Sequence, residues 1–304
     1  IGFQAILLSF DSDLKLLNTI ILNEGVPEIV FDADYPPDTL NISYSLIQGG
    51  LDSIITNDVG IVAWGAGNID IDPMFVDTAD GNYHLLATSQ LINGGHPDST
   101  DSDGSRADIG VYPYLNNYSG PTWYITESGN DTTATGDSDD PFRSIQSGIN
   151  FSSVDDSVTV AAGTYVENIN FRGRNIKVVG ENRETTIIDG DSSGTVVTFE
   201  NGETSSALLS GFTIQNGYVS DETNGGGVYI SASSPTLKKL VLKNCTAFYG
   251  GGIFIYHSTS LLENISVYGN ESEKGAGIYL DNTAVTLKNV ASYSNSSGTH
   301  AGGM

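Results

Sequence analysis

The fold is decided by a repeat near the end of the sequence: GGGVYISASSPTLKKLVLKNCTAFY (225–249), GGGIFIYHSTSLLENISVYGNESEK (250–274) and GAGIYLDNTAVTLKNVASYSNSSGTH (275–300). A further copy begins with AGGM at 301–304, so successive copies start 25, 25 and 26 residues apart. A glycine-rich start, a strand-like run and a downstream Leu recur together at this period. A self-similar period of this length indicates a repeat architecture in which each unit stacks on the next.

Within each copy, apolar residues alternate with other residues, which is the signature of a strand. The aligned alternating pairs are Val228 and Ile230, Ile253 and Ile255, and Ile278 and Leu280. Two further apolar columns follow: Leu237, Leu262 and Leu287, then Leu240, Ile265 and Val290. Short strands separated by Gly, Ser and Asn turns predict an all-β fold. We expect a right-handed parallel β-helix with about 25 residues per coil, each coil shielding the apolar face of its neighbours.

A short helix is expected before the first coils of this region. In DDPFRSIQSGINFSS, Phe142, Ile145 and Ile149 fall on one helical face, and Asp140 stands where a helix could begin. The pattern predicts a capping helix near 141–150, covering the open end of the solenoid.

The stretch 122–190, with PFRSIQSGI and VAAGTYVENINF, resembles the entry to pectate-lyase-like right-handed β-helix proteins. The glycine-led repeats that follow are similar to the parallel β-helix repeats of bacterial surface proteins. Together these resemblances cover about 122–304. They imply a fold more specifically than an activity.

The first part of the chain carries the same kind of periodicity. LKLLNTIIL (14–22) and LNISYSLIQ (40–48) align at an offset of 26 residues, which predicts two more coils. The run DPMFVDTADGNYHL and the run DGSRADIGVY follow, within about 68–114. This segment resembles the terminal part of choice-of-anchor Q β-helix proteins, in which such runs close a solenoid.

These patterns predict two solenoids in tandem. Residues 1–115 are expected to hold the C-terminal coils and closing segment of a first β-helix. Residues 116–136, rich in Asn, Ser, Thr and Gly, are expected to form a linker. Residues 137–304 are expected to hold the cap and first coils of a second β-helix that is truncated, because the sequence stops inside a repeat.

The charge, the apolar runs and the cysteine content of the chain limit the classes of partner that it can bind and the compartments in which it can work. With 37 acidic and 12 basic residues, the formal net charge is -25, which opposes binding to nucleic acid. No apolar run approaches the ~18 residues of a membrane span, so direct membrane insertion is not expected. The lone Cys245 rules out an internal disulfide framework. We expect a secreted or bacterial cell-surface protein whose targeting or anchoring segment lies outside this sequence.

One acidic cluster could bind Ca²⁺. It consists of Asp98, Asp101, Asp103 and Asp108 in DSTDSDGSRAD. Hard oxygen ligands at alternating positions suit Ca²⁺, although no Glu closes a twelve-residue EF-hand loop. The alternative is a structural Asp-rich turn with Arg106 paired to a carboxylate. Ca²⁺ is the only cofactor that the sequence suggests.

A second acidic group precedes the expected helix. Its members are Asp137, Asp139 and Asp140. Carboxylates stabilise a helix N-terminus through its free amides and dipole, so capping is preferred over metal binding.

The repeats also place aromatic residues in columns. Strand alternation predicts that the members of the first column point outward and stack from coil to coil, and these are Tyr229, Phe254 and Tyr279. Tyr268 and Tyr293 form a second column on another face. Exposed aromatic rings in a line can stack on the sugar rings of a polysaccharide or cell-surface glycan. They can equally do no more than stabilise neighbouring coils, by roughly 0.5–1.5 kcal/mol per pair.

Asn270 and Asn295 occupy matching positions after their strands. They could form a stacked Asn ladder between coils, or they could simply adopt the left-handed conformation that turns favour.

Catalysis has little support in the sequence. The four histidines are scattered, and the lysines of 225–304 have no recognisable acidic cluster beside them on an aligned strand. We expect a non-catalytic extracellular β-helix scaffold that is adhesin-like or binds polysaccharide. The alternative is a polysaccharide lyase or hydrolase acting on acidic polysaccharide, with its catalytic coils outside this sequence. A purely structural spacer is a third interpretation.

Overall fold

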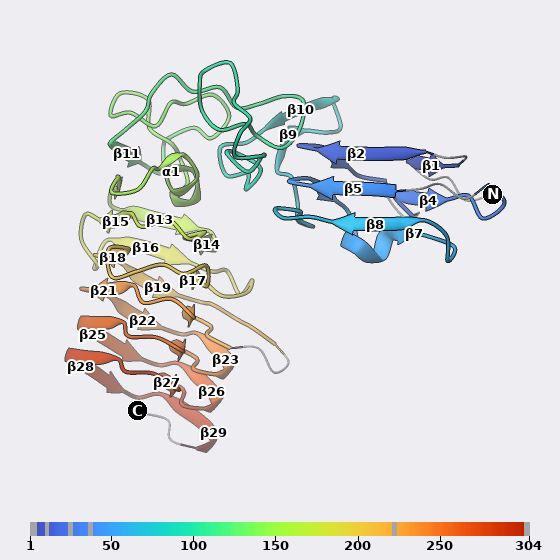
Figure 1. Ribbon diagram of the computed structural model, residues 1–304. Helices are drawn as coiled ribbons and strands as arrows, with labels where there is room; N and C mark the ends of the chain where they lie inside the picture. Colours follow the sequence, from blue (N-terminus) through green and yellow to red (C-terminus); the bar gives the residue numbers. More distant parts are fainter. Residues whose placement is uncertain (1–4, 10–11, 24–26, 36–38, 221–223, 301–304) are drawn as a thin grey trace. The chain divides into compact units, whose positions relative to one another are not determined.

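The computed structural model describes residues 5–9, 12–23, 27–35, 39–220 and 224–300 (Figure 1). The chain forms two compact units, Ile1–Asn117 (unit 1) and Tyr118–Met304 (unit 2). Short parallel strands repeat along each unit, which confirms the predicted all-β, right-handed parallel β-helix. Within the described ranges, no helix has the length and apolar character needed to cross a membrane.

The strands of unit 2 fall into four stacks. The first stack is β11 (Thr122–Ile125), β12 (Ser157–Val160), β15 (Lys177–Gly180), β18 (Leu208–Ser210) and β21 (Thr236–Lys238). The second is β13 (Gly163–Val166), β16 (Thr186–Asp189), β19 (Thr213–Gln215) and β22 (Val241–Lys243). The longer strands β25 (Leu261–Tyr268) and β28 (Thr286–Tyr293) continue both stacks.

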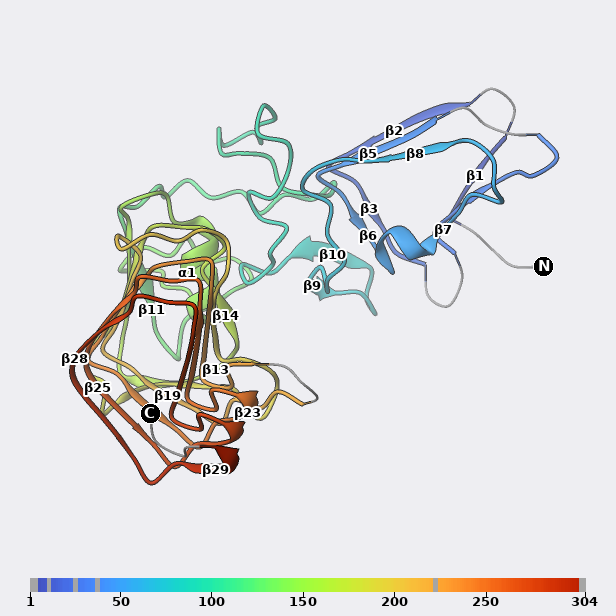
Figure 2. The same cartoon turned by 60° about the horizontal axis from the view of Figure 1, so that its bottom comes forward.

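Two further stacks run through unit 2, and among the described strands the fourth is formed only after residue 245. The third stack is β14 (Ile169–Asn170), β17 (Val197–Phe199), β20 (Val228–Ser231), β24 (Ile253–Tyr256) and β27 (Ile278–Asp281). The fourth is β23 (Thr246–Tyr249), β26 (Glu271–Lys274) and β29 (Ser296–His300). Figure 2 shows these coils overlying one another around a common interior.

The interior of unit 2 is the apolar column that the repeat predicts. Val228 pairs with Ile253, and Ile253 pairs with Ile278, each in parallel register. Their exposed fractions are 0%, 0% and 4%. The aliphatic side chains therefore stack above one another inside the solenoid, away from water.

The corners between strands repeat as regularly as the strands do. Lys239, Asn264 and Asn289, spaced by 25 residues, all have φ between 50° and 59°. This left-handed conformation turns the chain sharply, and Asn tolerates it better than most residues do. The Asn content of the repeats thus partly reflects the geometry of the corners.

The cap helix is present but begins later than predicted. α1 spans Ile145–Phe151 and packs on β11, β12 and β14. Phe142, expected inside the helix, instead bridges to Ile125 in parallel, and its backbone exchanges hydrogen bonds with Tyr124 and Thr126. Strand pairing with β11 therefore delays the start of the helix.

The carboxylates that cap α1 are not the predicted ones. Glu167 accepts hydrogen bonds from the Ile145 and Gln146 amides at 2.8 and 3.0 Å, and Asp131 accepts one from the Ser144 amide at 3.2 Å. Burial, with a smaller contribution from the charge of Asp131, raises the pKa of Glu167 to about 7.

The acidic group that the sequence predicted as the helix cap, Asp137, Asp139 and Asp140, does not cap α1. Capping by this group is wrong, because its hydrogen bonds are made within the loop that precedes the helix. Asp137 accepts the Asp139 and Asp140 amides, and Asp140 accepts the Thr135 amide.

The segment 116–136 differs from a simple linker. It contains β11, which pairs with β12 residue by residue. Within β11, Trp123 and Ile125 are 2% and 1% exposed. The first stack of unit 2 therefore begins inside the predicted linker. The sequence did not reveal this strand because polar residues surround its short TWYI pattern.

Unit 1 is a shorter solenoid followed by a pair of antiparallel strands and by residues 86–117, which we call the closing segment after the role that the sequence predicts. Its elements are β1 (Ile6–Leu8), β2 (Asp13–Leu17), β3 (Ile20–Ile21), β4 (Ile29–Phe31), β5 (Thr39–Ser43), β6 (Leu46–Ile47), η1 (Gly50–Ser53), β7 (Ile54–Ile55), β8 (Ile61–Trp64), β9 (Phe75–Asp77) and β10 (Asn82–Leu85). β1-β4-β7, β2-β5-β8 and β3-β6 form parallel stacks, whereas β9 and β10 pair antiparallel. The predicted offset of 26 is confirmed, since Leu14 pairs with Leu40 and Ile20 pairs with Leu46.

Candidate functional site: a polar and aromatic row on unit 2

Five outward-facing side chains line up across neighbouring strands of the second stack of unit 2. We call them the polar–aromatic row: Asp189, Gln215, Lys243, Tyr268 and Tyr293. Each member pairs in parallel register with the next, and each lies one position beyond an inward-facing residue of its strand. The row therefore places a carboxylate, a carboxamide, an ammonium group and two phenol rings on successive strands.

The carboxylate end of the row is held by amides. Asp189 accepts hydrogen bonds from Gln215 Nε2 at 2.7 Å and from Asn216 Nδ2 at 2.9 and 3.0 Å. Partial burial alone would raise the pKa of Asp189. The hydrogen bonds from Gln215, the Asp191 amide and Asn216, together with the charge of Lys243, lower it below its ordinary value. Asp189 is thus an ionised, oriented acceptor and is poorly suited to act as a general base near neutral pH.

The other end of the row is aromatic. The rings of Tyr268 and Tyr293 stack with centroids 5.1 Å apart and planes inclined by 13°. Tyr293 is 50% exposed, and Tyr268 is partly buried. Lys243 pairs in register with Tyr268 on the other side. This end offers apolar ring surface beside an ammonium group.

The first predicted aromatic column is aligned as expected but is closely packed. The ring centroids of Tyr229 and Phe254 lie 5.5 Å apart, and those of Phe254 and Tyr279 lie 5.6 Å apart, with nearly parallel planes. Tyr249 adds a tilted contact of 4.8 Å to Tyr279. Phe254 is only 6% exposed, so its ring faces are occupied by its neighbours. Glycan binding by this column stays a prediction, and the geometry favours coil-to-coil stabilisation.

The acidic cluster of unit 1 forms a network of carboxylates that accept backbone hydrogen bonds. Asp108 accepts the Asn93 amide at 2.7 Å and the Tyr114 amide at 2.8 Å. Asp101 accepts the Asp108 amide at 2.9 Å, as a structural turn requires.

The remaining members of that cluster are less enclosed. Asp103 accepts hydrogen bonds from Ser105 and from the Asn116 amide, whereas the Asp98 side chain is 91% exposed. Arg106, expected to pair with a carboxylate, hydrogen-bonds to the Gly95 carbonyl at 2.7 Å. In the part of the chain that the structure describes, no group of three or more His, Cys, Asp or Glu residues is placed to hold a metal ion. Calcium binding here stays a prediction.

Burial perturbs the innermost carboxyl of this cluster. Asp108 is 4% exposed, and its burial raises its pKa to about 7 despite the two amide hydrogen bonds. The charges of Asp101 and Asp103 add to the increase. Both oxygens of Asp108 are engaged with the backbone, so its role in this geometry is to hold the closing segment together.

Sequence reasoning identified only the aromatic half of the polar–aromatic row. Gln215 lies 26 residues after Asp189, and Lys243 lies 28 residues after Gln215. The intervals then become 25 and 25. The irregular upstream spacing concealed the alignment, which follows only from the strand register.

Comparison with known proteins concerns part of the chain. Residues 127–173, which include α1 and β12 to β14, match a family described as a protein of unknown function (DUF1565). Pectin methylesterase PemA from Erwinia chrysanthemi is 14% identical with a TM-score of 0.36, and the similarity covers 55% of this chain and 64% of that one. A pectin methylesterase in complex with hexasaccharide VII is 15% identical with a TM-score of 0.37, with the same two shares. The chain spans less than two thirds of the length of either structure.

No curated protein matches the chain. A shared fold does not transfer an activity, so the function has to be argued from the residues of this chain.

Proposed function

We propose that this chain is a non-catalytic β-helix scaffold that binds polysaccharide along the polar–aromatic row. The observation that supports this proposal is the continuity of the row. Its five members are aligned by parallel register on strands about 4.8 Å apart, so an extended polymer could touch several of them at once.

The chemistry of the row suits a sugar chain. The Tyr268 and Tyr293 rings provide apolar surface for the C–H face of a sugar ring, and Gln215 and Asp189 provide an amide and an acceptor for hydroxyl groups. Lys243 adds one positive charge, which would favour a uronate or another acidic sugar at that position.

A scaffold role is preferred over catalysis for a reason of geometry. The oxygens of Asp189 are held by two side-chain amides, and its lowered pKa makes the carboxylate a weak proton acceptor, so it is poorly suited to act as a general base. The alternative, a polysaccharide lyase or hydrolase acting on acidic polysaccharide, is retained because Lys243 favours such substrates.

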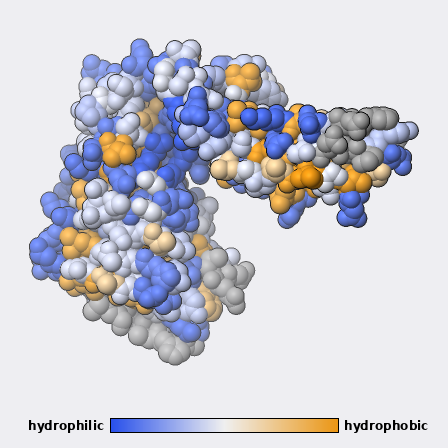
Figure 3. Space-filling model, in the orientation of Figure 1, coloured by the Kyte–Doolittle hydropathy of each residue, from blue (hydrophilic) through white to orange (hydrophobic). Residues whose placement is uncertain are grey.

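We also propose that the protein is secreted or displayed on a bacterial surface. The support is its net charge of -25 and the resemblance of 68–114 to the closing segment of choice-of-anchor Q proteins. Much of the face in Figure 3 is hydrophilic, as suits a surface that meets solvent and hydrated polymer.

Affinity electrophoresis of the purified chain in gels containing neutral or uronate polysaccharides tests the proposal. We expect retardation in at least one polymer, reduced about tenfold in affinity by Tyr293→Ala, which is the loss of roughly 1.4 kcal/mol. Tyr218→Ala is the matched control, because Tyr218 is 48% exposed on the same unit but outside the row. Tyr279→Ala separates the row from the packed aromatic column.

The same samples are assayed for unsaturated products and for new reducing ends. Binding without turnover supports the scaffold. Turnover would support the lyase or hydrolase alternative, and equal retardation of wild type and Tyr293→Ala would remove the row from consideration.

A further inference from the structure

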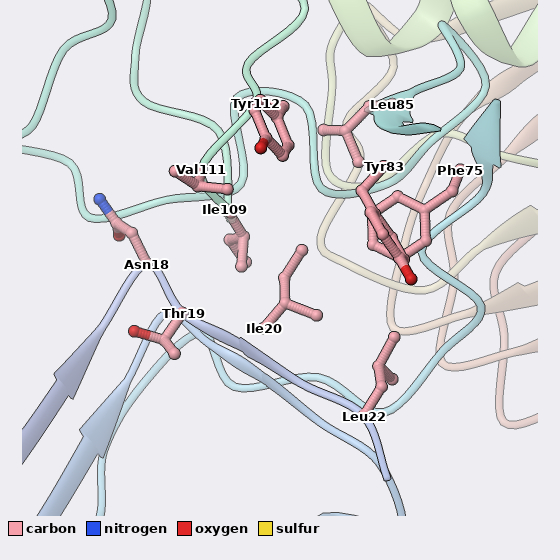
Figure 4. Close-up of a pocket in the computed structure, with 11 residues that line it drawn as sticks. Asn18, Thr19, Ile20, Leu22, Phe75, Tyr83, Leu85, Ile109, Val111 and Tyr112 are labelled. Atoms are coloured by element: carbon pink, nitrogen blue, oxygen red, sulfur yellow. The ribbon is translucent and has the colours of Figure 1, made fainter. Parts of the chain in front are cut away.

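Unit 1 contains a cavity that the proposed function does not use. Its volume is about 550 Å³, within the range of sites that bind small ligands or side chains. The floor is the outward face of β3, from which Ile20 and the adjacent Leu22 project (Figure 4). The walls come from the β9–β10 hairpin and from the segment 109–112 of the closing region.

The walls are apolar and are fixed in place. Phe75 and Tyr83 meet edge to face with centroids 5.3 Å apart, and Tyr112 packs on His84 at 4.9 Å. The Gly110 amide donates to the Asn18 carbonyl at 3.0 Å, which ties the segment 109–112 to the chain just before β3. The walls of the cavity are therefore held by contacts within unit 1.

Several apolar and aromatic side chains around the cavity are exposed. Leu22 is 40% exposed, Tyr83 48%, Val111 80% and Tyr112 46%. In Figure 3 hydrophobic residues gather in patches over unit 1. Clusters of exposed apolar side chains mark surfaces that bind partners.

The polar groups at the cavity do not favour a sugar. Asn18 Oδ1 accepts the His96 amide at 2.7 Å, and Thr19 Oγ1 donates to the Leu17 carbonyl at 3.0 Å. The Asn18 side-chain amide NH2 and the phenol groups of Tyr83 and Tyr112 remain, which are few for the several hydroxyls of a buried sugar ring. Unmatched hydroxyls would each cost about 1–3 kcal/mol, so the cavity favours an apolar group.

The charge of unit 1 indicates which kind of ligand would bring an apolar group to the cavity. Residues 1–117 include 17 acidic residues and only two basic ones, Lys15 and Arg106. None of the described residues that line the cavity is charged. An anionic amphiphile would be repelled on approach, whereas a cationic partner would be attracted.

We propose that this cavity binds the apolar anchor side chain of a positively charged peptide segment. One large aromatic or branched aliphatic side chain fills the space over Ile20, and flanking Lys or Arg residues meet the acidic surface of unit 1. The open side of the cavity lets the peptide backbone continue across the surface. This inference is independent of polysaccharide binding by unit 2.

The probe is a nine-residue peptide with a central Trp flanked on each side by two Lys, labelled for fluorescence anisotropy with the full chain. Two comparison peptides replace the Trp by Ala or the Lys residues by Glu. We expect saturable binding of the first peptide and affinities lower by about tenfold or more for the other two.

The cavity is tested with the double variant Leu22→Ser, Val111→Ser, in which both side chains are already exposed and the fold should persist. The matched control is Leu51→Ser, Ile61→Ser, since Leu51 and Ile61 are 51% and 63% exposed in the same unit outside the cavity. We expect about tenfold weaker binding for the cavity variant and a change below about twofold for the control.

Several outcomes would overturn the proposal. Equal binding of the Ala peptide would show attraction by charge alone, and equal binding of the Glu peptide would remove the charge argument. Equal losses in both double variants would indicate nonspecific association. Saturation by a neutral sugar or a neutral hydrophobic dye, without binding of the Lys and Trp peptide, would assign the cavity to a small molecule instead.

Discussion

Asn270 and Asn295 are joined across one coil by a hydrogen bond of 3.0 Å from Asn270 Nδ2 to Asn295 Oδ1. Asn270 Oδ1 in turn accepts the Cys245 amide of the preceding coil at 3.0 Å. Asn270 is 1% exposed, so this ladder replaces water for polar groups of the interior. Of the two interpretations that the sequence left open, the ladder is the one present.

Replacing Asn270 should destabilise unit 2. Asn270→Ala leaves the Cys245 amide buried without its acceptor, and we expect a loss of about 2–3 kcal/mol. Thr259→Ala is the control, because Thr259 makes a similar contact between coils, to Ser234 at 3.1 Å, on the exposed surface. Its effect should stay within about 0.5 kcal/mol. Urea unfolding followed by circular dichroism measures both, and equal losses would contradict a special role for the buried amide.

Close approach of coils requires glycine at position 252. A Cβ there would lie 2.5 Å from the Gly277 carbonyl oxygen and 2.7 Å from Val267 Cγ1. Gly252→Ala should therefore cost about 3 kcal/mol or more by forcing two coils apart. A Cβ added at Gly202 would meet no heavy atom within 4 Å, but the residue has a φ of 80°, which is strained for alanine. We therefore expect Gly202→Ala to lower the free energy of unfolding by only about 1 kcal/mol. Thermal unfolding of the pair separates collision from backbone strain, and similar melting temperatures would contradict the prediction.

The buried carboxyl of Asp108 should make unit 1 more stable in mild acid. Its folded pKa is about 7, above its ordinary value of 3.8. Protonation therefore favours the folded state, and this contribution is complete below about pH 3.8 and is lost as the pH rises to 7. The change is on the order of 4 kcal/mol.

Asp108→Asn should remove that dependence. Urea unfolding between pH 4 and pH 8, with Trp64 as the reporter in a Trp123→Phe background, gives the free energy of unfolding of unit 1 for both proteins. The Asn amide cannot accept both backbone hydrogen bonds, so Asp108→Asn lowers the free energy of unfolding at every pH. The measurement that tests the prediction is therefore the slope of this free energy against pH, compared between the two proteins. Parallel curves for the two proteins would show that Asp108 titrates normally.

The thiol of Cys245 should be unreactive in the folded protein. Burial raises its pKa to about 12, and its side chain is 0% exposed. Reaction needs an accessible thiolate, so Ellman's reagent at pH 8 should label Cys245 only when the coil opens. The labelling rate should rise with urea in step with unfolding of unit 2. Complete labelling within seconds in buffer alone would contradict this expectation.

Lys243 should determine the preference for acidic sugars in the polar–aromatic row. Lys243→Gln removes the only positive charge among its five members, so binding to uronate polymers should weaken by about tenfold, and more in low salt. Binding to neutral polymers should be nearly unchanged. Lys239→Gln is the control, since Lys239 is exposed at a corner outside the row. A uniform loss on all polymers would indicate a structural effect instead.

The sequence predicted the fold of unit 2 well because its last coils are uniform. A constant period of 25 residues puts Val228, Ile253 and Ile278 in register without any knowledge of the structure. The start of the cap helix could not be predicted in the same way, because the spacing of Phe142 fits a helix and its pairing with Ile125 is a contact between distant segments.

The candidate sites depended still more on register and on distant packing. Asp189 and Gln215 become neighbours only after loops of unequal length are accommodated between coils. The cavity of unit 1 arises where a closing segment near Tyr112 covers β3 incompletely. No local pattern reports how far one segment covers another.

The regular coils of unit 2 have a consequence for how such a protein can change in size. The three coils of 225–300 pair with one another in the same register and turn at corners of matching conformation. Tandem duplication of about 75 base pairs of coding DNA would insert one more coil and lengthen the molecule by about 4.8 Å. The inserted coil would also extend the polar–aromatic row by one residue, so recombination alone could adjust reach and avidity together.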